Sequence, residues 1–215
     1  MVVLNKILLT VAVYFLVAQA FGDDNLSSTN PPATVLPADF AWDASLINLK
    51  EIRLGEAAQT NSQNPDVQEF GMRMVRDHSR LNARLEKIAQ GEGVPLPDTN
   101  TFYIPVAAPQ DKQATQLMTE TPQERLRDAQ LDVQSLASQS GAAFDRTYAA
   151  AMVRGHKDAI DKFQNASATL LDEPLKKYAD RGLRVIRDHF EMAQKLDSEV
   201  STNVPAGGTN TAPGM

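Results

Sequence analysis

The chain contains no cysteine among its 215 residues. It therefore carries neither a disulfide nor a lipid linked through a thiol, and it has no thiol nucleophile. The sequence also has no glycine-rich phosphate loop and no strand-turn-helix context for a serine nucleophile. Aromatic residues make up only 6% of the chain, while alanine, leucine, glutamine, glutamate and arginine are plentiful, which favours helices over strands.

Positive charge is in the minority. The chain has 21 lysine and arginine residues against 27 aspartate and glutamate residues, which gives a formal net charge of -6. An acidic chain is repelled by phosphate backbones and by anionic lipid surfaces. We therefore expect no nucleic acid as a partner.

Long apolar runs are also missing, apart from one near the N-terminus. Lys6 precedes the apolar stretch 7–18, and Ala18-Gln19-Ala20 supplies a small-x-small cleavage site. Residues 1–20 are therefore expected to be a secretory signal peptide. A membrane anchor is the rival interpretation, but a spanning helix needs about 20 apolar residues. We expect no transmembrane segment after cleavage.

Proline and glycine mark the ends of the domain and one internal connection. Residues 21–37 are expected to be a flexible tether and residues 201–215 a disordered tail, which leaves 38–200 as a single helical domain. Prolines 95, 97, 105 and 109 predict a long irregular connection. Apolar residues at three- and four-residue spacing predict helices over about 37–60, 65–90, 122–138, 142–169 and 173–200. The predicted fold is all-α: a ferritin-like four-helix bundle with one long crossover and a short extra helix.

All three histidines occur in one recurring pattern of a β-branched residue, arginine, any residue and histidine. The pattern is found in Val75-Arg-Asp-His78, Val153-Arg-Gly-His156 and Ile186-Arg-Asp-His189. Each histidine lies three or four residues from its apolar neighbours, so it belongs to the core stripe of its helix. Glu51 interrupts the stripe of the first helix in the same way. The four groups are predicted near the middle of their helices, and they are expected to meet in one layer.

One carboxylate and three imidazoles are ligands that suit copper, zinc or iron. The candidate ligands are Glu51, His78, His156 and His189. Met74, Met152 and Met192 lie within one turn of a histidine. They are predicted on one side of the layer, where soft sulfur favours copper.

A buried polar network is the alternative to a metal site. The three histidines and Glu51 would then only fix the register of the helices. Asp77 and Asp188 each precede a histidine, and they are expected at the edge of the layer or in water. The paired Glu-x-x-His motifs of di-iron sites are missing, which disfavours a di-iron oxidase. No enzymatic activity is indicated.

Four segments of the sequence resemble one family. They are FAWDASLINLKEIRLGEAA, NPDVQEFGMRMVRDHSRLNARLEKIA followed by GVPLP, SGAAFDRTYAAAMVRGHKDAIDKF and LKKYADRGLRVIRDHFEMAQKL. Together they are similar to the ferritin-like domain of unknown function found in bacterial exported proteins, often described as outer membrane proteins. The resemblance covers about residues 38–200. It implies a helical bundle in the envelope of a Gram-negative bacterium, either periplasmic or associated with the outer membrane.

Two hypotheses about function follow. In the first, the exported bundle binds a single transition-metal ion in its core and serves envelope metal handling or stress protection. In the second, it is a non-enzymatic interaction module that binds an envelope protein partner, and its buried His–Glu network holds no metal.

Overall fold

The computed structural model describes residues 35–99, 102 and 121–202. Within these residues, all five elements of regular secondary structure are α-helices. The helices are α1 (Pro37–Asn61), α2 (Pro65–Glu92), α3 (Pro122–Ala137), α4 (Gly141–Thr169) and α5 (Glu173–Thr202). The all-α prediction is confirmed, and the predicted helix ends lie within two residues of the observed ones. The expected signal peptide (1–20) lies outside the described residues, as do most of the tether and all of the tail except its first two residues, which belong to α5.

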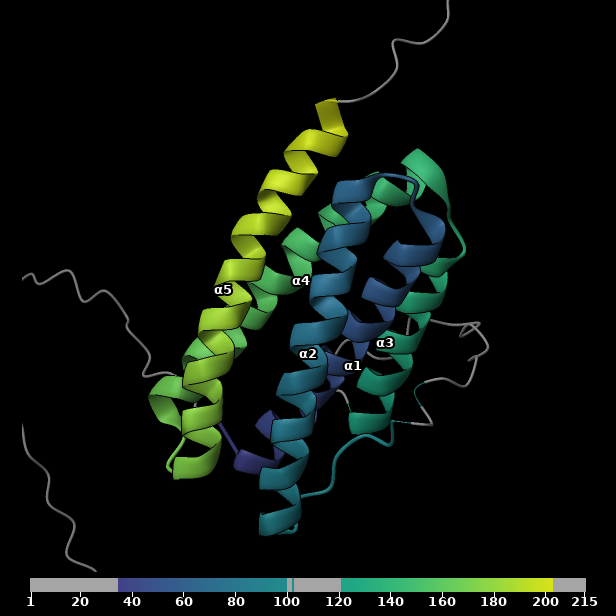
Figure 1. Ribbon diagram of the computed structural model, residues 1–215. Helices are drawn as coiled ribbons and strands as arrows, with labels where there is room; N and C mark the ends of the chain where they lie inside the picture. Colours follow the sequence, from purple (N-terminus) through teal and green to yellow (C-terminus); the bar gives the residue numbers. More distant parts are fainter. Residues whose placement is uncertain (1–34, 100–101, 103–120, 203–215) are drawn as a thin grey trace, which may run out of the picture. The chain divides into compact units, whose positions relative to one another are not determined.

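The four long helices form two hairpins, α1 with α2 and α4 with α5. α1 also packs on α4, and α2 packs on α5. α3 lies outside this group of four, against α1 and α4 (Figure 1). The short extra helix therefore covers the bundle rather than completing it. No helix in the described part of the chain is long and apolar enough to cross a membrane.

α3 is held to the bundle by an apolar contact and by an ion-pair bridge. Phe102 is buried together with Leu46 and Leu49 of α1 and Ala129 of α3. The carboxylate of Asp43 on α1 accepts hydrogen bonds from Arg125 of α3 at 2.5 Å and from Lys162 of α4 at 2.8 Å. These contacts hold α3 across the groove between α1 and α4.

Local sequence signals explain the helix ends. Thr121 and Glu124 form a capping box at the start of α3, where each side chain accepts a hydrogen bond from the other residue's backbone. The side chain of Asn64 caps α2 by accepting from the backbone N–H of Asp66 at 3.0 Å. α2 ends at Gly93, whose φ of 68° is a conformation that favours glycine.

Buried polar groups divide the core of the bundle into two apolar clusters. The first cluster contains Ala44 of α1, Leu81 of α2, Ala159 of α4 and Ile186 of α5. The second contains Leu54, Met74, Met152 and Ala193 from the same helices. Between them, along each of the four long helices, lies the polar layer, which we define as Asn48, Glu51, His78, His156 and His189. The order of the clusters along the chain also shows that α2 and α4 run in one direction while α1 and α5 run in the other.

Two close contacts at glycine set the register of the helix pairs. A Cβ atom at Gly71 of α2 would lie 2.8 Å from the carbonyl oxygen of Gly55 on α1 and 2.6 Å from the Cβ of Ala58. A Cβ atom at Gly182 of α5 would lie 2.5 Å from the ring of Phe163 on α4. Because a side chain at either glycine would push the paired helices apart, each hairpin packs in only one register.

We predict that Gly71→Ala destabilises the protein by about 1–3 kcal/mol, because the added methyl group overpacks the contact between α1 and α2. Gly91→Ala in the same helix is the matched control. Nothing lies within 4 Å of a Cβ atom at Gly91, so this variant is expected to gain up to about 1 kcal/mol from helix propensity. Urea unfolding measures both changes. Equal effects of the two substitutions would contradict the close contact.

Candidate metal centre

The three histidines meet in the centre of the bundle. His78 comes from α2, His156 from α4 and His189 from α5, and none of them is more than 1% exposed. One ring nitrogen of each histidine lies within 4.8 Å of a ring nitrogen of the other two. The ring centres are 5.3–5.9 Å apart. Among the described residues, these three form the group of side chains that could hold a metal ion.

The backbone fixes the protonated nitrogen of His156. Its Nδ1 lies 2.8 Å from the carbonyl oxygen of Met152, one turn earlier in α4. A carbonyl oxygen only accepts hydrogen bonds, so Nδ1 carries the proton. In the neutral ring, the lone pair is then on Nε2.

A side-chain amide fixes His78 in the same way. Nδ1 of His78 lies 3.0 Å from Oδ1 of Asn48 on α1. The amide nitrogen of Asn48 donates to the hydroxyl oxygen of Tyr178 on α5 at 2.9 Å, so the amide oxygen is the atom that faces the ring. Nδ1 therefore donates, and Nε2 keeps its lone pair.

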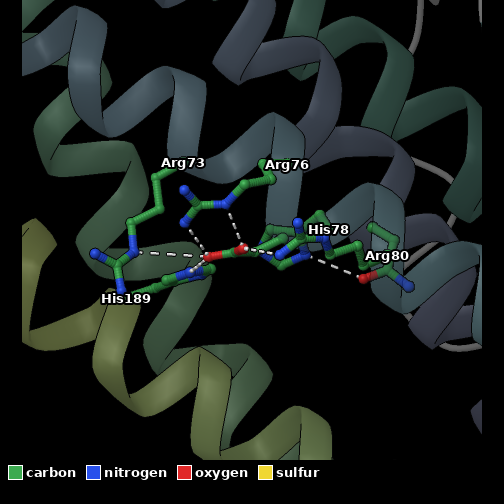
Figure 2. Close-up of polar contacts among 7 residues, drawn as sticks. Arg73, Arg76, His78, Arg80 and His189 are labelled. Atoms are coloured by element: carbon green, nitrogen blue, oxygen red, sulfur yellow. Dashed lines mark hydrogen bonds and ion pairs between the residues drawn. The ribbon is translucent and has the colours of Figure 1, made fainter.

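A carboxylate fixes His189 through its other nitrogen. Nε2 of His189 lies 3.2 Å from Oδ2 of Asp77. Arg76 donates to the same carboxylate at 2.9 and 3.1 Å, and Arg73 lies 3.6 Å from it (Figure 2). The hydrogen bond from Arg76, aided by the one from His189, lowers the pKa of Asp77 to about 2. Asp77 is therefore an ionised acceptor at neutral pH, and the lone pair of His189 is on Nδ1.

Each ring thus keeps one nitrogen without a partner: Nε2 of His78, Nε2 of His156 and Nδ1 of His189. All three are buried, and within the described residues no donor reaches them. The other nitrogen of each ring is hydrogen-bonded to a separate partner outside the histidine group. We therefore identify the three unpartnered nitrogens with those that lie within 4.8 Å of one another. The core therefore gathers three nitrogen acceptors that lack a donor.

Burial keeps the rings of His78 and His189 neutral. Loss of solvation lowers the pKa of His78 well below its ordinary value of 6.5, and repulsion from the other two histidines lowers it further. Burial also lowers the pKa of His189 to about 4. Neutral imidazole is the form that binds metals.

The spacing of the rings matches that of metal-bound histidines. An ion at about 2.0–2.1 Å from each nitrogen, with the ring centre about 1.2 Å farther out, places three tetrahedrally arranged ring centres about 5 Å apart. The observed separations of 5.3, 5.5 and 5.9 Å are close to this value. Small side-chain movements are enough to reach it.

Glu51 lies beside His156 but outside the mutually close group. It is 4% exposed, and its Oε1 would lie 3.4 Å from a Cβ atom at Gly155, the residue before His156. Its Oε2 is buried without a hydrogen-bond partner in the described parts of the chain. Loss of solvation raises the pKa of this carboxyl group, although the nearby His156 acts to lower it.

A groove leads from the surface to Glu51. It has a volume of about 480 Å³ and lies between α1 and α4, with α3 along one side. Glu51 and Gly155 both line it. Because Gly155 has no side chain, the carboxylate packs directly on the backbone of α4 at the inner end of the groove.

The three methionines belong to a single apolar cluster. Met74 and Met152 are fully buried in the second cluster, and Met192 is partly buried against it. They thus lie on one side of the polar layer. All three pack among apolar side chains there.

The sequence did not predict most of the groups that accept hydrogen bonds from the histidine rings. Asn48 shares the stripe of Glu51, three residues earlier, and this spacing is the signal that would have placed it in the layer. The carbonyl of Met152 leaves no signal in the sequence. Asp77 lies at the edge of the layer, which is one of the two places expected for it. Its hydrogen bond with His189 was not predicted. Asp188 is exposed, which agrees with the other expected place.

Comparisons with known proteins identify the fold and a family. The sequence model of a family described as a domain of unknown function, DUF4142, matches residues 25–196. The structure resembles a crystal structure of a DUF305 protein from Streptomyces coelicolor, which is described as secreted. The TM-score is 0.57 at 10% sequence identity, with 77% of this chain and 93% of that chain covered. At this identity the likeness shows the fold alone. No curated protein matches the chain.

Proposed function

The chain belongs to the DUF4142 family, as its resemblance to exported bacterial proteins of unknown function predicted, and we propose that its bundle binds one transition-metal ion. The proposal rests on three buried imidazole nitrogens that lie close together without a donor, while the other nitrogen of each ring is held by a hydrogen bond. Metal-bound histidines in proteins are oriented in the same way, by a hydrogen bond from the other ring nitrogen to a carboxylate or a carbonyl. The fixed tautomers exclude hydrogen bonds among the rings themselves.

A metal ion satisfies this arrangement better than water does. Each buried acceptor without a donor costs about 1–3 kcal/mol. One water molecule has two hydrogens, so it leaves at least one of three converging acceptors unpaired. A metal ion accepts all three lone pairs at once. For the same reason, a purely structural network is the weaker explanation of the polar layer.

Glu51 is the fourth ligand in this proposal. Its buried carboxylate is adjacent to His156, and its Oε2 lacks a partner among the residues described. A bound dication is the counter-ion that this carboxylate needs, because a buried charge is stable only when it is paired. The groove between α1 and α4 gives the ion a route from solvent to this carboxylate and then to His156.

Three imidazoles and one carboxylate suit copper, zinc or iron. The methionine cluster beside the layer favours copper among these, since thioether sulfur is a soft ligand. A His₃ site with a carboxylate at its open side is suited to holding an ion and to exchanging it through the groove. Such a site fits envelope metal handling or protection against metal stress.

Export is part of this proposal. Residues 1–20 have the pattern of a secretory signal, and the DUF305 protein with a similar fold is described as secreted. We place the working protein in the periplasm or at the outer membrane. Metal ions from the environment reach these compartments before the cytoplasm.

We predict that the purified, untagged protein binds about one equivalent of copper, zinc or iron. His156→Ala should weaken this binding by more than about 100-fold, which exceeds the usual loss for an outer partner. His156→Gln serves as a second variant that preserves side-chain volume. Elemental analysis and calorimetric titration measure both stoichiometry and affinity. A folded wild-type protein that takes up none of these metals would exclude the proposal.

Removal of an outer partner should weaken metal binding without removing a ligand. Asp77→Ala is expected to lower the affinity about 10- to 100-fold, because His189 loses the acceptor that orients its ring. Asp188→Ala is the matched control, since Asp188 also precedes a histidine directly but is exposed. Its affinity should match that of the wild type. Equal affinities of the two variants would show that Asp77 does not orient the site.

A further inference from the structure

A second groove lies between the later part of α2 and the first part of α5, at the end of the bundle where α2 finishes and α5 begins (Figure 1). Its volume is about 710 Å³. Five cationic side chains line it: Arg80, Arg84 and Lys87 from α2, and Lys177 and Arg181 from α5. None of its lining residues is acidic, although the whole chain has a net charge of -6. Positive charge is therefore concentrated in this groove, although the chain as a whole is negatively charged.

These cations are mostly uncompensated. Arg80 lies 3.9 Å from Asp77, and Lys177 lies 3.4 Å from Glu173. Arg84, Lys87 and Arg181 have no ion-pair or hydrogen-bond partner among the residues that the structure covers. Two of the pairs, Arg80 with Arg84 and Lys177 with Arg181, also repel each other at a spacing of four residues on one helix. An anion bound between the two helices would relieve this repulsion.

The floor of the groove is apolar. Ile88 and Pro174 line it together with Tyr178, whose side chain is only 1% exposed. The hydroxyl of Tyr178 accepts a hydrogen bond from Asn48 inside the bundle, so the ring is fixed. The groove thus combines cationic side chains with accessible apolar surface from Ile88 and Pro174, next to a fixed aromatic ring.

We propose that this groove binds an organic phosphate. The phosphoryl group lies between Arg84 and Arg181, whose planar guanidinium groups bind phosphate oxygens in pairs. Lys87 adds charge without fixed geometry. The apolar part of the ligand packs on Ile88 and Pro174. This site lies outside the histidine centre, and it does not depend on a metal ion being bound there.

Titration of the full chain with phenyl phosphate, followed by NMR or calorimetry, tests the proposal. Saturable binding is expected, and it should be tighter than the binding of inorganic phosphate, because the phenyl ring adds contact with the floor. The double variant Arg84→Ala/Arg181→Ala should bind phenyl phosphate about tenfold or more weakly, since two charge-assisted hydrogen-bond donors are lost.

Arg146→Ala/Lys157→Ala is the matched control. Both residues are exposed on α4, and neither lines the groove. This variant removes the same charge and should bind phenyl phosphate as the wild type does. Absence of saturable binding, or an equal loss in the control, would overturn the proposal.

Sedimentation with vesicles of phosphatidylcholine and phosphatidic acid distinguishes a lipid phosphate from a soluble ester. Sedimentation that is lost in Arg84→Ala/Arg181→Ala but kept in the control identifies a lipid as the source of the phosphate. Phenyl phosphate binding that depends on the groove, without sedimentation, identifies a soluble ester. Both results support the site. Circular dichroism checks that all variants keep the helical fold, as expected for exposed positions.

Discussion

Three hydrogen bonds on the outer side of the histidine group constrain the rest of the core. In each, a ring N–H donates to a different kind of acceptor: the amide oxygen of Asn48, the backbone carbonyl of Met152 and the carboxylate of Asp77. Because each acceptor takes the N–H of one ring, the remaining nitrogen of that ring carries a lone pair that faces its neighbours. The fold thus keeps three acceptors together without a donor. Such an arrangement costs free energy unless a ligand uses it, which is why we interpret it as a binding site.

The apolar packing holds this group in place. The two clusters on either side of the polar layer are built from the same four helices, so a shift of one helix along another would move a histidine into an apolar cluster. The contacts of Gly71 with Gly55 and of Gly182 with Phe163 oppose such shifts. Stability and function therefore rest on one register. In any other register, the groups of the polar layer would lose their hydrogen-bond partners, and their burial would cost free energy.

The fold and the burial of the site were readable from the sequence because both depend on helical periodicity. Counting turns from apolar neighbours placed His78, His156 and His189 on core stripes, and the shared middle position on each helix predicted a common layer. The prediction did not extend to the partners of these rings. The bond between His189 and Asp77 joins α5 to α2, so it depends on how two helices rotate against each other. The basic groove was missed for the same reason: Arg84 and Arg181 lie far apart in the sequence, and only the packing of α2 on α5 brings them to one groove.

The metal site proposed here requires one particular tautomer of each histidine, and NMR measures these tautomers. In the metal-free protein at neutral pH, long-range ¹⁵N–¹H correlation spectra identify which ring nitrogen of each histidine carries the proton. We predict that the proton is on Nδ1 in His78 and His156 and on Nε2 in His189. A proton on the inner nitrogen of any of these rings would contradict the grouping of three buried acceptor nitrogens.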